Sequence, residues 1–186
     1  MMRWFRKSTE EALVVSMSGV KLGDRVLVLG AGDPALLAGV AVRSGLTGHA
    51  ILVDETDART NTAVAAAERD GALVEGVTAP WTRLPLETTS VDVAIARDVL
   101  PALTPERRAG CLAEIMRVLR PGGRCLVIDA APRAGLGALI WRRTTDEFYA
   151  TRGGAPRAME AQGFRAVRTL AERDGLVFVE GVRPNL

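Results

Sequence analysis

The stretch Val26-Leu27-Val28-Leu29-Gly30-Ala31-Gly32-Asp33-Pro34-Ala35 decides the fold of this chain. Its apolar run leads into a glycine-rich turn and then into the start of a helix. Asp33 can serve as the N-cap, and Pro34 occupies the favoured first helical position. Gly30 and Gly32 allow the backbone to turn sharply and to approach a ligand where a Cβ would collide. We therefore predict a buried strand, a turn, and a helix whose amino end faces a ligand.

A second apolar run, Ile51-Leu52-Val53, ends in Asp54. A carboxylate in this position can accept both hydrogen bonds of a ribose diol, so the turn and the acid together predict a nucleotide-type cofactor site. A glycine-rich turn alone is often only structural. The same residues also fit the dinucleotide fingerprint, with Ala35 in the third small position.

Length and composition indicate an ordinary globular domain. The chain has 186 residues, of which 48% are hydrophobic and 25% charged, and its formal net charge is +2. We expect a single domain over residues 1–186. The small net charge gives no indication of nucleic-acid binding. Nine arginines and four acids gather between Arg97 and Arg143, and a solvated helix face accounts for them.

The sequence gives no sign of a membrane segment, a disulfide framework or a metal site. No apolar run approaches the roughly 18 residues of a membrane span, and the N-terminal residues are unlike a signal peptide. Cys111 and Cys125 do not form a CxxC pair. We therefore expect a cytoplasmic protein that does not insert into a membrane and binds no metal.

Strand-like and helical segments alternate along most of the chain. The expected strands are Arg25–Leu29, Ala50–Val53, Leu73–Val77, Val91–Ala96, Arg124–Asp129, Ala166–Leu170 and Leu176–Gly181. The expected helices lie at 34–44, 57–70, 104–119 and Ala155–Gln162. This alternation predicts an α/β fold with a doubly wound, mostly parallel sheet of seven strands. The last two strands form an antiparallel hairpin, because the link at 171–175 is too short for a parallel return.

Two segments lie outside this alternation. We expect residues 1–20 to form an N-terminal helical arm, with Trp4 and Leu13 among its apolar positions. Residues 134–154 mix apolar side chains with arginines, and we expect them to form a variable cap over the substrate. Such a cap suits an aromatic or anionic small molecule. It is equally compatible with plain packing or with the surface of a homodimer.

Four segments carry a family pattern: residues 25–32, 84–94 and 114–124, and Ala161-Gln162-Gly163-Phe164. The third is the most specific, and there we expect Pro121 to end a helix while Gly122 and Gly123 cap it. The pattern resembles the class I S-adenosylmethionine-dependent methyltransferases, and within them the type similar to the ubiquinone/menaquinone C-methyltransferases. The resemblance implies a Rossmann-like fold, S-adenosyl-L-methionine as cofactor, and direct methyl transfer to a small-molecule acceptor.

The resemblance also implies which residues contact the cofactor. The glycine turn contacts the methionine part, Asp54 holds the ribose, and the segment after the third strand contacts the adenine. The implied cofactor-binding residues are Gly30, Ala31, Gly32, Asp54, Glu55, Trp81 and Arg97. Val28 and Pro34 depart from the family pattern, which commonly has an acid and a third glycine there, and Pro34 lacks an amide hydrogen. Trp81 suits stacking on the adenine and core packing equally.

The residues that face the acceptor are expected on neighbouring strand ends. Methyl transfer from a sulfonium is an in-line displacement, so positioning alone can carry much of the catalysis. The candidates are Arg97 and Asp98 after the fourth strand and Asp129 after the fifth, since ligands bind at the carboxyl ends of such strands. A surface ion pair explains Arg97 and Asp98 equally well. His49 precedes the second strand and lies at the opposite edge.

Three functions of different classes fit these observations. The first is a small-molecule methyltransferase. The second is a catalytically degenerate relative that binds a ligand or a partner, which Val28 and Pro34 favour. The third is a nicotinamide-dependent oxidoreductase, because the glycine turn and Asp54 also satisfy the dinucleotide fingerprint. The C-terminal hairpin and the absence of a Tyr-x-x-x-Lys pair count against the third, since the lysines are Lys7 and Lys21.

Overall fold

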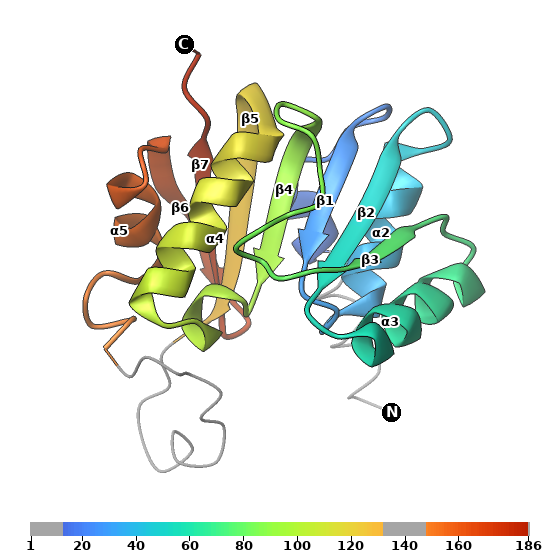
Figure 1. The fold of residues 1–186 in the computed structure, drawn as a ribbon, viewed down its shortest axis with the longest axis horizontal. Helices are drawn as coiled ribbons and strands as arrows, with labels where there is room; N and C mark the ends of the chain where they lie inside the picture. Colours follow the sequence, from blue (N-terminus) through green and yellow to red (C-terminus); the bar gives the residue numbers. More distant parts are fainter. Residues whose placement is uncertain (1–12, 132–147, 186) are drawn as a thin grey trace.

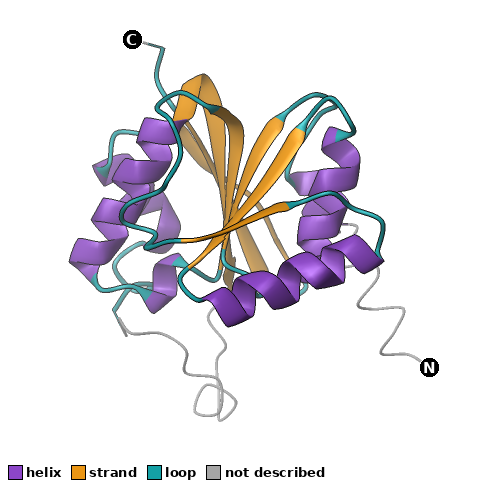
Figure 2. Ribbon diagram, turned by 45° about the vertical axis from the view of Figure 1, so that its right-hand side comes forward, coloured by secondary structure: helices purple, strands orange, loops and turns teal. Residues whose placement is uncertain are grey.

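The computed structural model describes residues 13–131 and 148–185. One twisted sheet carries helices on both faces (Figure 1; Figure 2). The strands are β1 Arg25–Leu29, β2 His49–Asp54, β3 Glu75–Thr78, β4 Val91–Arg97, β5 Leu119–Ala130, β6 Arg165–Arg173 and β7 Leu176–Val182. The helices are α2 Pro34–Ser44, α3 Asp57–Arg69, η1 Leu100–Ala102 (a 3-10 helix), α4 Pro105–Val118 and α5 Gly154–Ala161. Residues 13–17, at the end of the expected arm, are helical. The rest of that arm and most of the expected cap lie outside the described residues.

The strand order confirms the predicted fold class. The order is β3-β2-β1-β4-β5-β7-β6, and the pairs on both sides of β1 are parallel. Strand β7 runs antiparallel to both β5 and β6. The hairpin link is tighter than predicted, because only Asp174 and Gly175 separate β6 from β7. Both have positive φ, at 54° and 78°, as the two-residue hairpin turn that matches strand twist requires.

Each face of the sheet has its own apolar core, because successive side chains of a strand point to opposite faces. Val26, Val28 and Leu52 belong to the core that contains the buried side chains of α2 and α3. Leu27 and Leu29 belong to the core beneath α4 and α5. Burial on both faces explains why these strands read as continuous apolar runs instead of alternating patterns.

The link from α4 into β5 corrects one prediction. Helix α4 ends at Val118, and Leu119 already has extended backbone and is the first residue of β5. The residue before a proline avoids the helical region, so the chain becomes extended before the proline is reached. Residues 120–123 then interrupt the regular pairing with β4. A Cβ on Gly123 would lie 2.8 Å from the carbonyl oxygen of Arg120, so the glycines shape an irregularity inside the strand and do not cap the helix.

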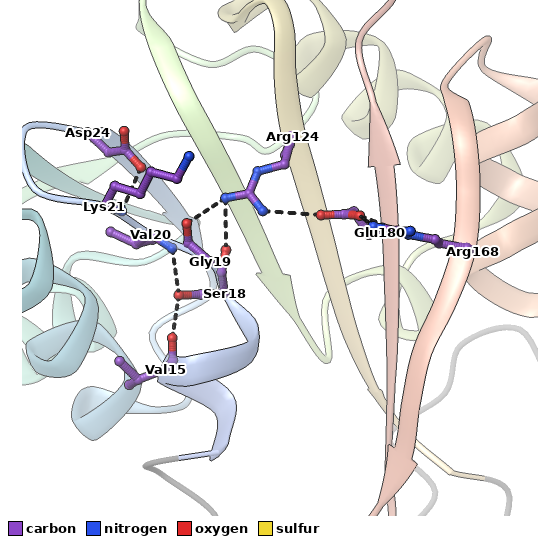
Figure 3. A network of polar contacts seen from close by, with 9 residues as sticks. All are labelled: Val15, Ser18, Gly19, Val20, Lys21, Asp24, Arg124, Arg168 and Glu180. Carbon is purple, nitrogen blue, oxygen red and sulfur yellow. Dashed lines mark hydrogen bonds and ion pairs between the residues drawn. The ribbon is translucent and has the colours of Figure 1, made fainter.

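A polar network joins the described end of the arm to the sheet (Figure 3). Arg124 on β5 donates hydrogen bonds to the carbonyl oxygens of Gly19 at 2.6 Å and Ser18 at 3.5 Å. It also pairs with Glu180 on β7 at 3.2 Å, and Arg168 on β6 pairs with the other oxygen of Glu180 at 2.9 Å. Because a buried carboxylate is stable only when it is paired, the network fixes the chain before β1 against three strands.

Two absences and the state of two thiols concern the described residues alone. Within them, no helix is long and apolar enough to cross a membrane, and no group of three His, Cys, Asp or Glu side chains could hold a metal ion. Cys111 and Cys125 are buried free cysteines. Burial raises the pKa of the Cys111 thiol to about 12, so it stays protonated at neutral pH.

Candidate functional site

Most of the residues predicted to bind a cofactor lie at the carboxyl ends of three adjacent strands, and Trp81 follows the next strand, β3. Strand β1 lies between β2 and β4, and the last residue of β1 is in register with both neighbours. Gly30 follows β1, Asp54 ends β2, and Arg97 ends β4. The strand order reverses next to β1, and ligands of doubly wound sheets bind outside the strand ends at this point.

The two glycines of the turn have different roles. Gly30 has a φ of 90°, and a Cβ there would lie 3.1 Å from Cγ2 of Val99. By contrast, nothing lies within 4 Å of a Cβ built on Gly32. Asp33 caps α2 as predicted, since its side chain accepts a hydrogen bond from the amide of Leu36 at 3.1 Å. Gly30 is thus required by the fold, whereas Gly32 leaves open space beside the turn.

Asp54 is fully buried at the end of β2 and is bonded to the glycine turn. Its Oδ2 accepts a hydrogen bond from the amide of Ala31 at 2.8 Å and lies 3.3 Å from Nη2 of Arg59. Its Oδ1 accepts from the amide of Thr56 at 3.3 Å. A carboxylate has about four acceptor positions, so one is left for a further donor. Asp54 therefore fixes the turn, and because it has no exposed surface, a ligand hydroxyl reaches its remaining acceptor position only after a local movement of the turn.

Glu55 and Trp81 lie on the α4 side of this edge. Glu55 forms an ion pair with Arg107 in the first turn of α4. Its Oε1 accepts a hydrogen bond from the amide nitrogen of Trp81 at 3.4 Å. The Trp81 indole is 6% exposed, and its Nε1 donates to the carbonyl of Val53 at 3.1 Å. Trp81 therefore packs in the core, one of its two expected roles, while stacking on an adenine stays a prediction.

Arg97 and Asp98 interact with elements on opposite sides of β4. Arg97 forms an ion pair with Asp33, the N-cap of α2, and both side chains are largely buried. Asp98 has a φ of 55°, and its Oδ1 accepts a hydrogen bond from the amide of Ala130 at 3.2 Å. Its own amide donates to the carbonyl of Ile128 at 2.9 Å. Non-glycine residues with positive φ are often found at functional sites.

Asp129 near the end of β5 is a buried carboxylate. It is 8% exposed, and its Oδ2 accepts a hydrogen bond from the hydroxyl of Tyr149 at 2.9 Å. Arg108 of α4 lies over the Tyr149 ring, with its Cζ 4.2 Å from the ring centroid. The pKa of Asp129 is raised to about 7, chiefly by burial and to a smaller extent by the nearby Asp98, while the Tyr149 hydrogen bond and Arg108 oppose the shift.

Three other features lie away from this edge or depart from the family pattern. Val28 is 2% exposed and packs in the core under α2, so an acid there would be buried. His49 begins β2 at the opposite edge and pairs with Glu75 at 2.9 Å.

A cavity of about 320 Å³ lies toward the amino end of β5, away from the glycine turn. It is lined by Met116, Pro121, Gln162, Gly163, Arg183 and Pro184.

Sequence reasoning missed the two arginines of α4. Arg107 and Arg108 reach Glu55 and Tyr149 from the first turn of the helix that follows β4. The signal was present, because the first turn of such a helix lies near the carboxyl edge of the sheet. Their partners could not be found, since no sequence spacing relates Arg107 to a residue 52 positions earlier.

The comparisons with known proteins agree with this arrangement. The family described as methyltransferase domain matches residues 27–127. The ubiquinone/menaquinone biosynthesis C-methyltransferase of Chromobacterium violaceum is 33% identical over 120 residues, which are 62% of this chain and 46% of that protein. The chain thus spans about half the length of the curated relatives it matches.

Two solved structures show the shared fold. A methyltransferase from Aquifex aeolicus, described as S-adenosylmethionine-dependent, has a TM-score of 0.76 at 21% identity and covers 93% of this chain and 89% of its own. The cyclase SpnF has a TM-score of 0.67 at 17% identity and covers 95% and 80%. A cyclase among these structures shows that the fold alone does not determine the reaction. Since the family match covers more than half of the chain, from β1 into β5, this protein belongs to the class I S-adenosylmethionine-dependent methyltransferases.

Proposed function

We propose that this chain binds S-adenosyl-L-methionine, the cofactor of its family, and transfers a methyl group to a small molecule. The observation that carries the proposal is the open space at Gly32, which follows Ala31, the residue whose amide is bonded to the buried Asp54. A ligand at this turn meets backbone without a Cβ, and a small movement of the turn would bring it to the remaining acceptor position of the buried Asp54. Family membership supports the cofactor, and the site residues support the place where it binds.

The residues present fit this cofactor. Gly30, Ala31 and Gly32 form the surface for its methionine part, and Asp54 accepts a ribose hydroxyl. The cofactor supplies a sulfonium methyl group that is transferred by in-line displacement. Glu55 borders the same edge, and Trp81 supports it from the core. The protein therefore acts mainly by orienting its ligands and excluding water.

Arg97 stabilises the site electrostatically. The N-cap carboxylate of Asp33 lies at the positive end of the α2 dipole, which already favours it. Its ion pair with Arg97 adds a second stabilising contact and ties β4 to α2. Asp33 keeps its hydrogen bond from the Leu36 amide, and Arg97 places a positive charge beside it at the edge where the methionine part would bind. We therefore assign Arg97 to cofactor binding.

The acceptor is proposed to lie over the ends of β4 and β5, where Asp98 and Asp129 are candidates for contact with it. A small molecule suits the net charge of +2, which offers little attraction to nucleic acid. The curated relative is called a C-methyltransferase in ubiquinone and menaquinone biosynthesis. We place the reaction in the cytoplasm.

A second candidate function rests on a specific observation. Asp54 already has three donors around it, and Pro34 offers no amide hydrogen at the amino end of α2. A family member with these features could bind a ligand or partner without turnover. Cofactor affinity is therefore the first quantity to measure.

Isothermal titration calorimetry of the purified chain with S-adenosylhomocysteine, S-adenosylmethionine and NAD tests the proposal. We expect both sulfur ligands to bind and NAD to give no heat. Gly32→Ala should leave the free energy of unfolding within about 0.5 kcal/mol of wild type. The same substitution should weaken the binding of S-adenosylhomocysteine at least about tenfold, because the added Cβ enters the ligand space.

The outcomes separate the alternatives. Absence of binding at millimolar S-adenosylhomocysteine would contradict the proposal and leave the degenerate relative. Binding without transfer to any acceptor in a screen of tritiated-methyl incorporation would also favour that relative. Equal affinity of wild type and Gly32→Ala would show that the ligand binds elsewhere. Asp70→Asn, an exposed substitution at the end of α3, serves as the matched control.

A further inference from the structure

Asp129 has one carboxylate oxygen that the proposed function leaves unexplained. Oδ1 of Asp129 is buried and has no hydrogen-bond partner, and it is the one such side-chain oxygen or nitrogen atom among the described residues. Buried polar atoms are nearly always paired, since leaving one without a partner costs about 1 to 3 kcal/mol. An unpaired buried oxygen at a ligand-binding edge is therefore a reason to look for a ligand.

The other oxygen of Asp129 is held in place by a fixed aromatic residue. The hydroxyl of Tyr149 donates to Oδ2 at 2.9 Å, and Tyr149 is 6% exposed. Arg108 lies against the Tyr149 ring, and its Nε and Nη2 donate to the carbonyl oxygens of Leu100 and Leu103 at 3.0 and 2.8 Å. These contacts fix the orientation of the carboxylate, because one oxygen is hydrogen-bonded while the other is buried without a partner.

The buried position of Asp129 favours proton exchange near neutral pH. Burial raises its pKa to about 7, Asp98 acts in the same direction, and Tyr149 and Arg108 oppose the shift. A carboxyl group whose pKa lies near the working pH can both accept and release a proton. The register also places this group near the active edge, since Ile128, the residue before Asp129, pairs with Arg97.

We propose that Asp129 is the proton acceptor for the methyl acceptor molecule, with Tyr149 as its positioning residue, and that the acceptor is a neutral compound bearing a hydroxyl or N–H group. This inference rests on the proposed function and adds the chemical class of the acceptor. The hydroxyl or N–H group of the methyl acceptor donates a hydrogen bond to Oδ1 of Asp129. The donated hydrogen bond of Tyr149 stabilises the carboxylate form.

The proton step is balanced within these groups. The O–H or N–H bond of the acceptor breaks, and its proton forms a new O–H bond with Oδ1. The electron pair of the broken bond stays on the acceptor and makes it a stronger nucleophile. The protonated carboxyl group later returns its proton to water. An anionic acceptor is disfavoured, because Asp98 and Asp129 would place like charges next to it. This narrows the aromatic or anionic class expected from the sequence.

The test uses phenol as a neutral hydroxyl probe and anisole, its methyl ether, as the matched probe without a donor. The side-chain carboxyl signals of 13C-labelled aspartate are followed by NMR in the free protein, and Asp129→Asn assigns the Asp129 signal. We expect that signal to titrate near neutral pH and to shift on addition of phenol. Phenol should bind at least about tenfold more tightly than anisole, and Asp129→Asn should remove this preference.

Tyr149→Phe keeps the ring and provides a second test if Asp129→Asn folds poorly. It removes a hydrogen bond that lowers the pKa of Asp129, so the Asp129 signal should titrate at higher pH than in wild type. Asp70→Asn should change none of these results. An Asp129 signal that titrates near pH 4, or equal binding of phenol and anisole, would overturn the inference.

Calorimetry with S-adenosylhomocysteine on the same samples separates the two proposals. Asp129→Asn should bind it with wild-type affinity, because Asp129 lies two strands away from β1. If wild type does not bind S-adenosylhomocysteine, the proposed function is contradicted, whatever the NMR titration shows. Normal S-adenosylhomocysteine binding with an ordinary Asp129 titration would overturn only the inference on Asp129.

Discussion

Arg97 and Asp33 are 64 positions apart in the sequence and form an ion pair at the edge where β1 and β4 end. Asp33 also caps α2, so a single carboxylate holds the start of a helix and the end of a strand. The exposed fractions of the two side chains are 18% and 16%. Because water is largely excluded, the pair contributes more than an exposed ion pair would.

Breaking this pair should destabilise the fold by an amount that depends on which partner is removed. We expect Arg97→Ala to lower the free energy of unfolding by about 1 to 3 kcal/mol, since it leaves Asp33 without its charged partner. Asp33→Asn should have a smaller effect, because asparagine also caps helices well. Urea unfolding of both variants and of the double variant gives the coupling energy. A coupling below about 0.3 kcal/mol would contradict a direct interaction.

Gly30→Ala should be more destabilising than Gly32→Ala. The φ of Gly30 is 90°, and its added Cβ would lie 3.1 Å from Val99. Left-handed backbone alone costs a residue with a Cβ about 1 to 2 kcal/mol, and the close contact adds to this. In a Val99→Ala background the loss should be smaller but not zero, because backbone strain remains. Thermal and urea unfolding measure both effects, and equal losses for the two glycine variants would refute the expectation.

The stability of the fold should fall in acid partly through Glu114. Its hydrogen bonds with Arg117 are the largest cause that holds the pKa of Glu114 below its usual 4.5, and the Leu84 amide, which donates at 2.8 Å, adds to the shift. The folded state therefore binds this proton less readily than the unfolded state. The stabilisation is complete above the unfolded pKa and is lost as the pH falls through the lower folded value.

Glu114→Gln removes this dependence while keeping an acceptor for the Leu84 amide. We expect the free energy of unfolding of wild type to exceed that of Glu114→Gln by about 1 kcal/mol at pH 7, with a smaller difference at pH 3. Urea unfolding at several pH values measures the two curves. Glu87→Gln, an exposed acid in the preceding loop, is the control. Parallel curves for wild type and Glu114→Gln would show that this carboxylate does not contribute.

Apolar runs and turn residues predicted the strands, the order of helices and the hairpin. Element boundaries were less accurate: β6 runs over Arg165–Arg173, longer than the expected Ala166–Leu170, because pairing with β7 extends it beyond its apolar residues. The expected helix cap after α4 was wrong for a related reason. Leu119 pairs with Val91, and this strand pairing takes the residue out of the helix.

The candidate site was predicted in its location but not in its contacts. Parallel strands bring their carboxyl ends to one edge, so Gly30, Asp54 and Arg97 could be placed near one another from sequence alone. The buried position of Asp54 and its bond to the amide of Ala31 could not be predicted. The unpaired oxygen of Asp129 could not be predicted either, because it depends on how β5 and Tyr149 pack together.

The sequence by itself determined the fold class, the family of this protein and the edge of the sheet at which Gly30, Asp54 and Arg97 meet, because these follow from local patterns. Apolar runs, glycines and caps act within a few residues of where they stand. Only the tertiary structure decided which charges meet, which carboxylate is buried and which buried oxygen has no hydrogen-bond partner. Those properties arise between residues far apart in the chain, such as Arg97 with Asp33, and depend on how completely packing excludes water.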